Sequence, residues 1–167
     1  MTRPVAVVIG PPGAGKTTIG QAVADALGVA FRDTDADVEA ATGSTIADLF
    51  VVEGEDHFRR LEAEAVATAL AEHDGVLALG GGAVLREQTR KLLAGHTVVF
   101  LDVGLADAAS RVGMARDRPL LLGNPRGQLH AMLEQRRPVY RSVATVTVPT
   151  DGRDVEQVTA DVLAALR

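Results

Sequence analysis

The segment Gly10-Pro11-Pro12-Gly13-Ala14-Gly15-Lys16-Thr17 decides how the rest of the sequence is interpreted. It fits the pattern G-x-x-x-x-G-K-[ST], follows the apolar run Val5–Ile9, and precedes a helical pattern that reaches Leu27. Its glycines let successive backbone N–H groups face one point, where the N-terminus of the next helix adds partial positive charge. Lys16 can reach β- and γ-phosphate oxygens, and the Thr17 hydroxyl can ligate Mg²⁺. The segment therefore predicts a purine nucleoside triphosphate site, without identifying the reaction.

The scarcity of lysine supports this interpretation. The chain contains fifteen arginines but only two lysines, Lys16 and Lys91. A sequence that uses arginine almost everywhere keeps lysine where a compact point charge suits a phosphate cradle. The structural alternative is a glycine turn that matches by chance, and the strand before it and the helix after it argue against that alternative.

Composition limits the class of protein. Of the 167 residues, 47% are hydrophobic and 23% are charged, which is typical of a globular protein. No linker or repeat interrupts the pattern, so we expect one domain over residues 1–167. No apolar run approaches the ~18–20 residues of a membrane span, and the start lacks a signal-peptide pattern. The absence of cysteine excludes a disulfide scaffold and a thiol nucleophile, and it fits a cytoplasmic protein.

Charge is distributed unevenly along the chain. The net charge of −5 argues against a nucleic-acid-binding protein, yet residues 111–141 carry a local charge of +5. A concentrated basic region on an acidic protein suits a small phosphorylated ligand, and a solvated arginine-rich face is the alternative. The seven arginines of this region are Arg111, Arg116, Arg118, Arg126, Arg136, Arg137 and Arg141.

Apolar runs alternate with helical patterns from end to end. Strands separated by helices predict a parallel α/β sheet covered on both faces. Glycines and prolines within residues 116–127 predict a mobile loop. The expected strands are Val5–Ile9, Val29–Phe31, Val76–Leu79, Thr97–Leu101 and Val143–Val148. The expected helices are Gly15–Leu27, Asp35–Thr42, one starting near Thr45, Glu55–Glu72, Arg86–Ala94, Leu105 to about Ala115, Leu129–Arg137, and a last one striped by Val155 to Leu166.

Two aspartates follow the second expected strand. Because the carboxyl ends of parallel strands line one crevice, Asp33 and Asp35 should lie near the phosphate loop. If the backbone there is extended, both side chains point the same way. One carboxylate could then hold metal-bound water while the other accepts a proton from an attacking hydroxyl. A polar turn that caps the next helix is the alternative.

Arg59 and the glycine triplet are further candidates. Arg59 could be held by Glu62 and directed at a carboxylate, or it could form an ordinary surface pair with Glu55. The triplet Gly80-Gly81-Gly82 suits backbone N–H groups that approach a ligand closely, and a flexible turn is the alternative.

The loop that contains Arg118 suits a closing segment. It could exclude water and bring Arg118 to a transferring phosphoryl group. The lone tyrosine, Tyr140, suits packing better than chemistry, and the four histidines lack metal-ligand spacing.

Taken together, these motifs resemble the shikimate kinase family, within the nucleoside-monophosphate-kinase-like P-loop group. The resemblance runs in order over essentially the whole chain. The matching segments are Gly10–Thr17, Asp33–Asp35, Ser44–Phe50, Phe58-Arg59 with Glu62, Gly80–Gly82, Arg118–Leu121, and Arg136-x-Pro138-x-Tyr140 followed by Ala144.

The resemblance implies a three-layer fold with a five-stranded parallel sheet of order 2-3-1-4-5. It implies an acceptor-binding segment at about 33–62 and a mobile lid at about 113–127. The implied reaction transfers the γ-phosphate of ATP to the 3-hydroxyl of shikimate, giving shikimate 3-phosphate and ADP on the route to chorismate and aromatic amino acids. Monomers are usual in the family.

The resemblance also implies roles for individual residues. Arg59 and Arg136 would hold the shikimate carboxylate, and Asp35 would meet the hydroxyls and act as the base. Lys16, Asp35 and Arg118 would be catalytic, while Thr17, and Asp33 through water, would hold Mg²⁺. The implied ATP contacts are Gly13, Ala14, Gly15, Lys16, Thr17, Thr18, Arg111, Arg118 and Arg153. The implied shikimate contacts are Asp35, Arg59, Gly80, Gly81, Gly82 and Arg136.

Two other functions are considered. A kinase for gluconate or a nucleoside monophosphate would keep the phosphate loop and lid, but it should need other acceptor residues. A nucleotide-gated binding protein without transfer activity is a second alternative, which the intact set of Lys16, Thr17, Asp33, Asp35 and Arg118 disfavours.

Overall fold

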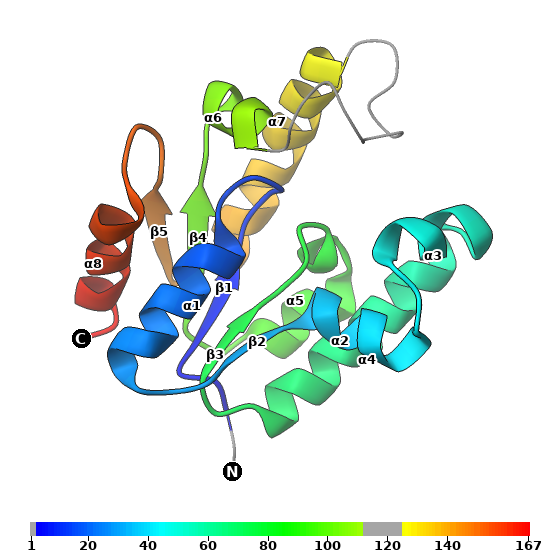
Figure 1. Ribbon diagram of the computed structural model, residues 1–167, viewed down its shortest axis with the longest axis horizontal. Helices are drawn as coiled ribbons and strands as arrows, with labels where there is room; N and C mark the ends of the chain where they lie inside the picture. The colour runs from blue at the N-terminus through cyan, green and yellow to red at the C-terminus, as the bar shows by residue number, and fades with distance from the viewer. Residues whose placement is uncertain (1–2, 112–124) are drawn as a thin grey trace.

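The chain folds around a five-stranded parallel sheet with the strand order β2-β3-β1-β4-β5 (Figure 1). The computed structural model describes residues 3–111 and 125–167. The order of the strands confirms the expected fold, because the first strand lies in the middle and each crossover contains at least one helix. The strands are β1 (Ala6–Ile9), β2 (Phe31–Asp33), β3 (Val76–Ala78), β4 (Val98–Asp102) and β5 (Val146–Pro149).

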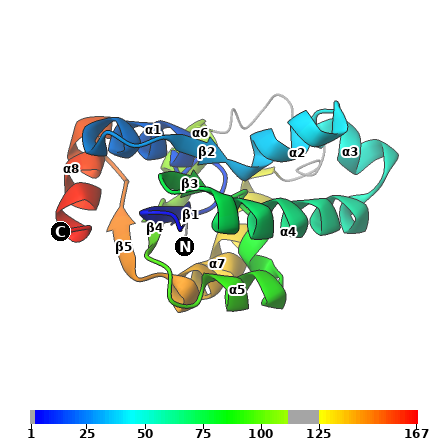
Figure 2. The ribbon, with the colours of Figure 1, turned by 90° about the horizontal axis from the view of Figure 1, so that it is seen from below.

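Helices cover both faces of the sheet and make three layers (Figure 2). Helices α1 and α8 pack on one face, and α4 and α5 pack on the other. Helices α2 and α3 lie with α4 beyond the β2 edge (Figure 1). The helices are α1 (Lys16–Leu27), α2 (Thr34–Thr42), α3 (Ile46–Val52), α4 (Glu55–Glu72), η1 (Ala83–Leu85, a 3₁₀ turn), α5 (Glu87–Leu93), α6 (Leu105–Arg111), α7 (Pro125–Val143) and α8 (Val155–Ala165).

The core follows the alternation of side chains along the central strands. In β1, Ala6 and Val8 join the cluster under α1 and α8, whereas Val7 and Ile9 join the cluster under α4 and α5. All four are buried, as expected for a strand covered on both faces. The uninterrupted apolar run before the phosphate loop is therefore a requirement of the central strand.

Helix α7 is longer than the sequence pattern predicts. It begins at Pro125, so the last three residues of the predicted loop 116–127 are helical, and it continues through Pro138 to Val143. A proline inside a helix costs about 3 kcal/mol. Leu129, Leu133 and Tyr140 are almost fully buried along α7, and each contributes about 2 kcal/mol. Burial therefore outweighs the proline, and the last strand starts at Val146 instead of Val143.

The second strand is shifted relative to its prediction. It spans Phe31–Asp33 instead of Val29–Phe31, because Phe31 and Asp33 pair with Val76 and Ala78 of β3. Helix α2 then starts at once, at Thr34. The shift places Asp33 at the carboxyl end of the sheet and Asp35 in a helical turn.

Among residues 3–111 and 125–167, the structure contains no helix with the length and hydrophobicity that crossing a membrane requires.

Candidate active site

The phosphate loop joins β1 to the first turn of α1. Gly13 and Gly15 have φ angles of 83° and 90°, a left-handed conformation that residues with a side chain rarely adopt. Gly15 caps α1 without a side-chain hydrogen bond, so the first N–H groups of the helix remain available to an anion. The loop borders a cavity of about 400 Å³. The residues lining it are Gly13, Gly15, Lys16, Thr17, Thr18, Asp33, Asp35 and Leu79.

Lys16 folds back over the loop that precedes it. Its Nζ donates to the carbonyl oxygens of Gly10 at 2.8 Å and Pro11 at 3.0 Å. Burial lowers the pKa of Lys16 to about 8, against the opposing effect of the Asp35 and Asp33 carboxylates. The ammonium group is therefore still mainly protonated at pH 7, and it is held against the carbonyl oxygens of Gly10 and Pro11.

Asp33 serves two partners with its two carboxylate oxygens. Oδ1 accepts from the backbone N–H of Asp35 at 2.9 Å and caps α2. Oδ2 accepts from the Thr17 hydroxyl at 3.2 Å. Asp33 therefore caps α2, as the alternative interpretation stated, and it also lies next to the phosphate loop, as expected. The Thr17 and Asp33 oxygens beside a phosphate loop suit Mg²⁺, which binds hard oxygen ligands and completes its shell with phosphates and water.

Asp35 reaches the same cavity from the first turn of α2. Asp35 is helical, as expected for a helix over Asp35–Thr42, so the extended backbone on which a shared direction of the two side chains depended is not present. Burial raises the pKa of Asp35 to about 6, with further contributions from Asp33 and Glu62, while Lys16 acts in the opposite direction. Asp35 is therefore mainly ionised at neutral pH and can still accept a proton.

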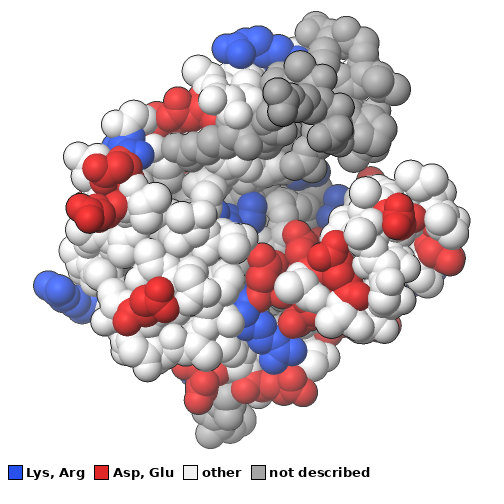
Figure 3. Space-filling model, viewed as in Figure 1, with Lys and Arg blue, Asp and Glu red and all other residues white. Residues whose placement is uncertain are grey.

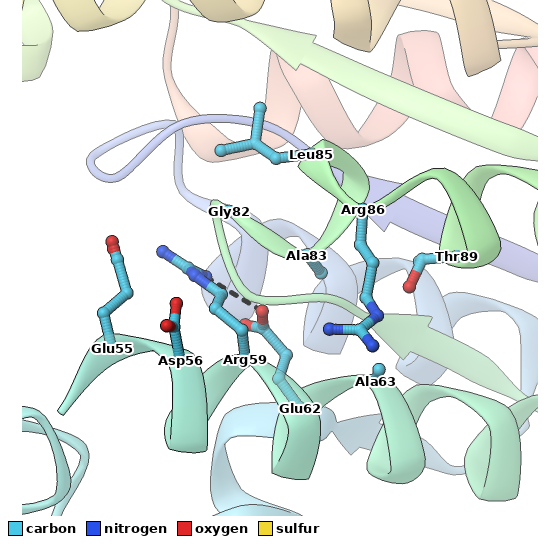
Figure 4. A pocket seen from close by; sticks show the side chains of 10 residues that line it. All are labelled: Glu55, Asp56, Arg59, Glu62, Ala63, Gly82, Ala83, Leu85, Arg86 and Thr89. Carbon is cyan, nitrogen blue, oxygen red and sulfur yellow. Dashed lines mark hydrogen bonds and ion pairs between the residues drawn. The ribbon is translucent and has the colours of Figure 1, made fainter. Parts of the chain in front are cut away.

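Arg59 on α4 pairs with Glu62 one turn later. Its Nη1 lies 2.9 Å from Glu62 Oε1, and Glu62 is only 3% exposed (Figure 4). The guanidinium carbon also lies 5.3 Å from the ring centre of Phe58 and 5.7 Å from that of Phe50. Burial raises the pKa of Glu62, although Arg59 acts against this shift. Arg59 is therefore anchored by a buried partner and is not part of a surface pair with Glu55.

The three glycines after β3 are explained by close approach. A Cβ on Gly80 would lie 2.6 Å from Asp35 Oδ1 and 2.7 Å from Glu62 Oε2. A Cβ on Gly82 would lie 2.7 Å from the guanidinium carbon of Arg59. None of the three has a positive φ, so the turn does not need glycine for its backbone conformation. Glycine is needed here because the side chains of Asp35, Arg59 and Glu62 occupy the space that a Cβ would fill.

The triplet also contacts the phosphate loop and α7. A Cβ on Gly81 would lie 3.1 Å from Pro12 Cδ. The Gly81 carbonyl accepts from the Tyr140 hydroxyl at 2.5 Å. Arg136, one helical turn before Tyr140, lies close enough to influence the pKa values of Lys16 and Glu62. The sequence predicted only a packing role for Tyr140. Its position four residues after Arg136, on the same face of a helix, could have indicated that it also lies near the site.

A second cavity, of about 280 Å³, opens beside Arg59. In Figure 4, Arg59 and Glu62 of α4 lie opposite Gly82 and the η1 turn. Figure 3 shows Lys and Arg side chains inside the hollow next to the part of the molecule formed by α2 and α3, with acidic side chains gathered beside it. The residues lining the cavity are Glu55, Asp56, Arg59, Glu62, Ala63, Gly82, Ala83, Leu85, Arg86 and Thr89.

The remaining residues predicted to contact ATP are Arg111, Arg118 and Arg153. Arg118 and most of the expected lid lie outside the described residues, and for Arg111 the structure describes the backbone at the end of α6. Arg153 donates to the Pro149 carbonyl at 2.9 Å and pairs with Asp161 at 2.6 Å, so its guanidinium braces the loop before α8. That loop borders a cavity of about 330 Å³. Its lining residues are Ala14, Gly15, Thr18, Ile19, Thr150, Arg153, Asp154, Val155 and Val158.

The parallel sheet, the phosphate loop and the acidic cavity beside it define a P-loop phosphotransferase. The family model described as shikimate kinase matches residues 12–167. The chain belongs to the shikimate kinase family.

Individual members of the family are similar to this protein over almost its whole length. The shikimate kinase of Salinispora arenicola is 62% identical over 98% of this chain and 98% of its own length. The shikimate kinase of Salinispora tropica is 61% identical with the same coverage. Among solved structures, shikimate kinase from Acinetobacter baumannii in complex with shikimate is 34% identical, covers 99% of this chain and 93% of its own, and superposes with a TM-score of 0.92.

Proposed function

We propose that this protein transfers the γ-phosphoryl group of ATP to the 3-hydroxyl of shikimate, giving shikimate 3-phosphate and ADP. ATP is the phosphoryl donor in the shikimate kinase family, to which the chain belongs. The relative from Acinetobacter baumannii is described in complex with shikimate. The two alternatives, a kinase for gluconate or a nucleoside monophosphate and a binding protein without transfer activity, are not favoured by these relatives.

One observation carries the proposal. The Gly80–Gly82 turn touches Pro12 of the phosphate loop on one side, and Asp35, Glu62 and Arg59 on the other. A phosphoryl donor cradled by the loop and an acceptor held by Arg59 therefore share one small space. In-line transfer requires that proximity, since catalysis here is largely positioning and electrostatic stabilisation.

Arg59 and Arg136 are proposed to bind the shikimate carboxylate. A guanidinium presents paired N–H donors that match a carboxylate. In support, Arg59 is fixed by Glu62 and by the rings of Phe50 and Phe58. The proposed remaining contacts of the acid are Asp35, Gly80, Gly81 and Gly82.

Asp35 is proposed as the proton acceptor in the transfer step. The 3-hydroxyl oxygen forms a bond to the γ-phosphorus while the bond to the β–γ bridging oxygen breaks, and ADP leaves with that electron pair. The hydroxyl proton passes to an Asp35 carboxylate oxygen, whose pKa of about 6 suits this acceptance near neutral pH. Lys16 leaves the Gly10 and Pro11 carbonyls to bind phosphate oxygens, which replace them as acceptors.

Thr17 and Asp33 are proposed to hold Mg²⁺, Asp33 through water. When bound, the ion neutralises charge on the β- and γ-phosphates. The Thr17–Asp33 hydrogen bond keeps both oxygens together at the edge of the phosphate loop. Gly13, Ala14, Gly15 and Thr18 complete the proposed contacts with the nucleotide phosphates.

Arg118 is proposed to stabilise the phosphoryl group as the lid closes, and Arg111 to pack on adenine. The loop braced by Arg153 is proposed to border the base, since its cavity adjoins Gly15 and Thr18. A monomer is proposed, as is usual in the family. Consumption of ATP favours a cytoplasmic location.

A coupled ADP-release assay tests the function. The purified protein is given ATP and Mg²⁺ with shikimate, gluconate or CMP in parallel. Turnover with shikimate alone is expected. Faster turnover with gluconate or CMP refutes the substrate assignment, and tight ATP binding without turnover refutes the kinase activity.

A further inference from the structure

Tyr140 connects three elements that meet at the acceptor side of the site. It lies on α7 and is only 1% exposed. Its ring stacks on Phe100 of β4, with 5.0 Å between ring centres and an angle of 26° between planes. Phe100 is in register with Ile9, the last residue of β1 before the phosphate loop. The ring of Tyr140 therefore packs against the strand pair that supports that loop.

The hydroxyl group of Tyr140 has a different environment from the ring. It donates to the Gly81 carbonyl at 2.5 Å, and Gly81 lies against Pro12 on its other side. Burial raises the pKa of this hydroxyl, Glu62 raises it further, and the nearby charges of Arg136 and Arg59 lower it. All three belong to, or support, the proposed carboxylate-binding part of the site.

The position of Gly81 affects both of its neighbours. Gly80 and Gly82 fit against Asp35 and Arg59 without room for a methyl group. A small displacement of the turn therefore changes the space available to the Asp35 carboxylate and to the Arg59 guanidinium. The Tyr140 hydroxyl holds the middle of this turn, and Arg136 projects from the same helix one turn earlier.

We infer that Tyr140 is a positioning residue for the acceptor, and that its hydroxyl sets the distance between the Gly80–Gly82 turn and Arg136. This inference rests on the proposed function, because it assigns the effect to shikimate and not to ATP. The ring contributes packing, whereas the hydroxyl fixes the position of α7 relative to the Gly80–Gly82 turn. The two contributions can be separated, because Tyr140→Phe removes only the hydroxyl.

The test compares Tyr140→Phe with a matched control. We expect Tyr140→Phe to raise the KM for shikimate about tenfold, with kcat and the KM for ATP within about twofold of wild type. The control is Thr145→Val, which removes a hydroxyl that donates to the His96 carbonyl at 3.2 Å and accepts from the Val98 N–H at 3.0 Å. Thr145 lies at the opposite end of the sheet, so its loss should lower stability but leave all three constants unchanged.

A second measurement uses the wild-type protein. Tyr140 is the only tyrosine and the chain has no tryptophan, so tyrosine emission reports on this residue alone. Shikimate should change that emission saturably, with a midpoint equal to its dissociation constant from calorimetry.

The inference is overturned if Tyr140→Phe keeps the wild-type KM for shikimate, if its loss is confined to kcat, or if Thr145→Val raises the same KM equally. Emission that is insensitive to saturating shikimate also overturns it. Wild-type protein that does not turn over shikimate refutes the proposed function itself, and this inference with it.

Discussion

Replacing Gly82 with alanine isolates the effect of one methyl group on Arg59. Gly82 has φ −99° and ψ 1°, which alanine can adopt, so the substitution imposes no left-handed backbone strain. The new Cβ would lie 2.6 Å from Nη2 and 2.7 Å from Cζ of Arg59, whereas ordinary contacts are 3.4–4 Å. The guanidinium must therefore retreat by about 1 Å and strain its 2.9 Å pair with Glu62.

This displacement should affect binding far more than folding. Arg59 is the far end of a flexible side chain, and alanine restricts the unfolded chain, so the unfolding free energy should change by less than about 1 kcal/mol. Misplacing a substrate-positioning group by about 1 Å can cost about a hundredfold. We expect kcat/KM for shikimate to fall about 10- to 100-fold, mainly through KM, while the KM for ATP stays within about twofold.

Gly95→Ala is the matched control with the opposite expectation. Gly95 has φ +85° and open space around it, so alanine there strains the backbone but touches nothing. It should cost about 1 kcal/mol and lower Tm by about 3 °C without changing the KM for shikimate. The coupled ADP-release assay and thermal unfolding measure both variants. An unchanged KM in Gly82→Ala, or a parallel loss of stability and affinity in both variants, would refute the reasoning.

Three further predictions address the charged groups. Lys16→Ala should abolish transfer in the ADP-release assay and keep Tm within a few degrees, because the hydrogen bonds of the side chain go to the Gly10 and Pro11 carbonyls of the phosphate loop and not to the core. Arg59→Ala should raise the KM for shikimate by about a hundredfold with little effect on the KM for ATP, since it removes a paired contact with a carboxylate. Asp35→Asn should stabilise the protein at pH 8 and not at pH 3.5. The folded-state pKa of Asp35 is raised from 3.8 to about 6, so ionisation costs folding free energy, about 3 kcal/mol, which is complete above pH 6 and absent below 3.8.

Each of these predictions has a contradicting outcome. Near-normal turnover by Lys16→Ala would remove Lys16 from the transfer step. A change in Arg59→Ala confined to ATP would show that the guanidinium does not bind the acid, and Arg59→Lys, which keeps charge but not the planar fork, should restore only part of the affinity. Equal urea midpoints for Asp35→Asn and wild type at pH 8 would contradict the buried ionised carboxylate.

The sequence by itself determined the phosphate loop and the parallel sheet. Both depend on local rules: glycines before Lys16 permit a left-handed turn, and the uninterrupted apolar run before them suits only a strand buried on both faces. The order of the motifs also identified the family. The loop and the strand can be predicted from the sequence because the residues that form each of them are neighbours in the chain as well as in space.

Tertiary structure decided the features that depend on residues far apart in the chain. Pairing with β3 moved the second strand forward so that it ends at Asp33, and burial of Leu129, Leu133 and Tyr140 carried α7 through Pro138. The role of the glycine triplet was also invisible in the sequence, because the side chains that need its space come from α2 and α4. The hydroxyl of Tyr140 gained its partner, 59 residues away, only when α7 packed beneath that turn, because a long-range contact has no signature in local periodicity.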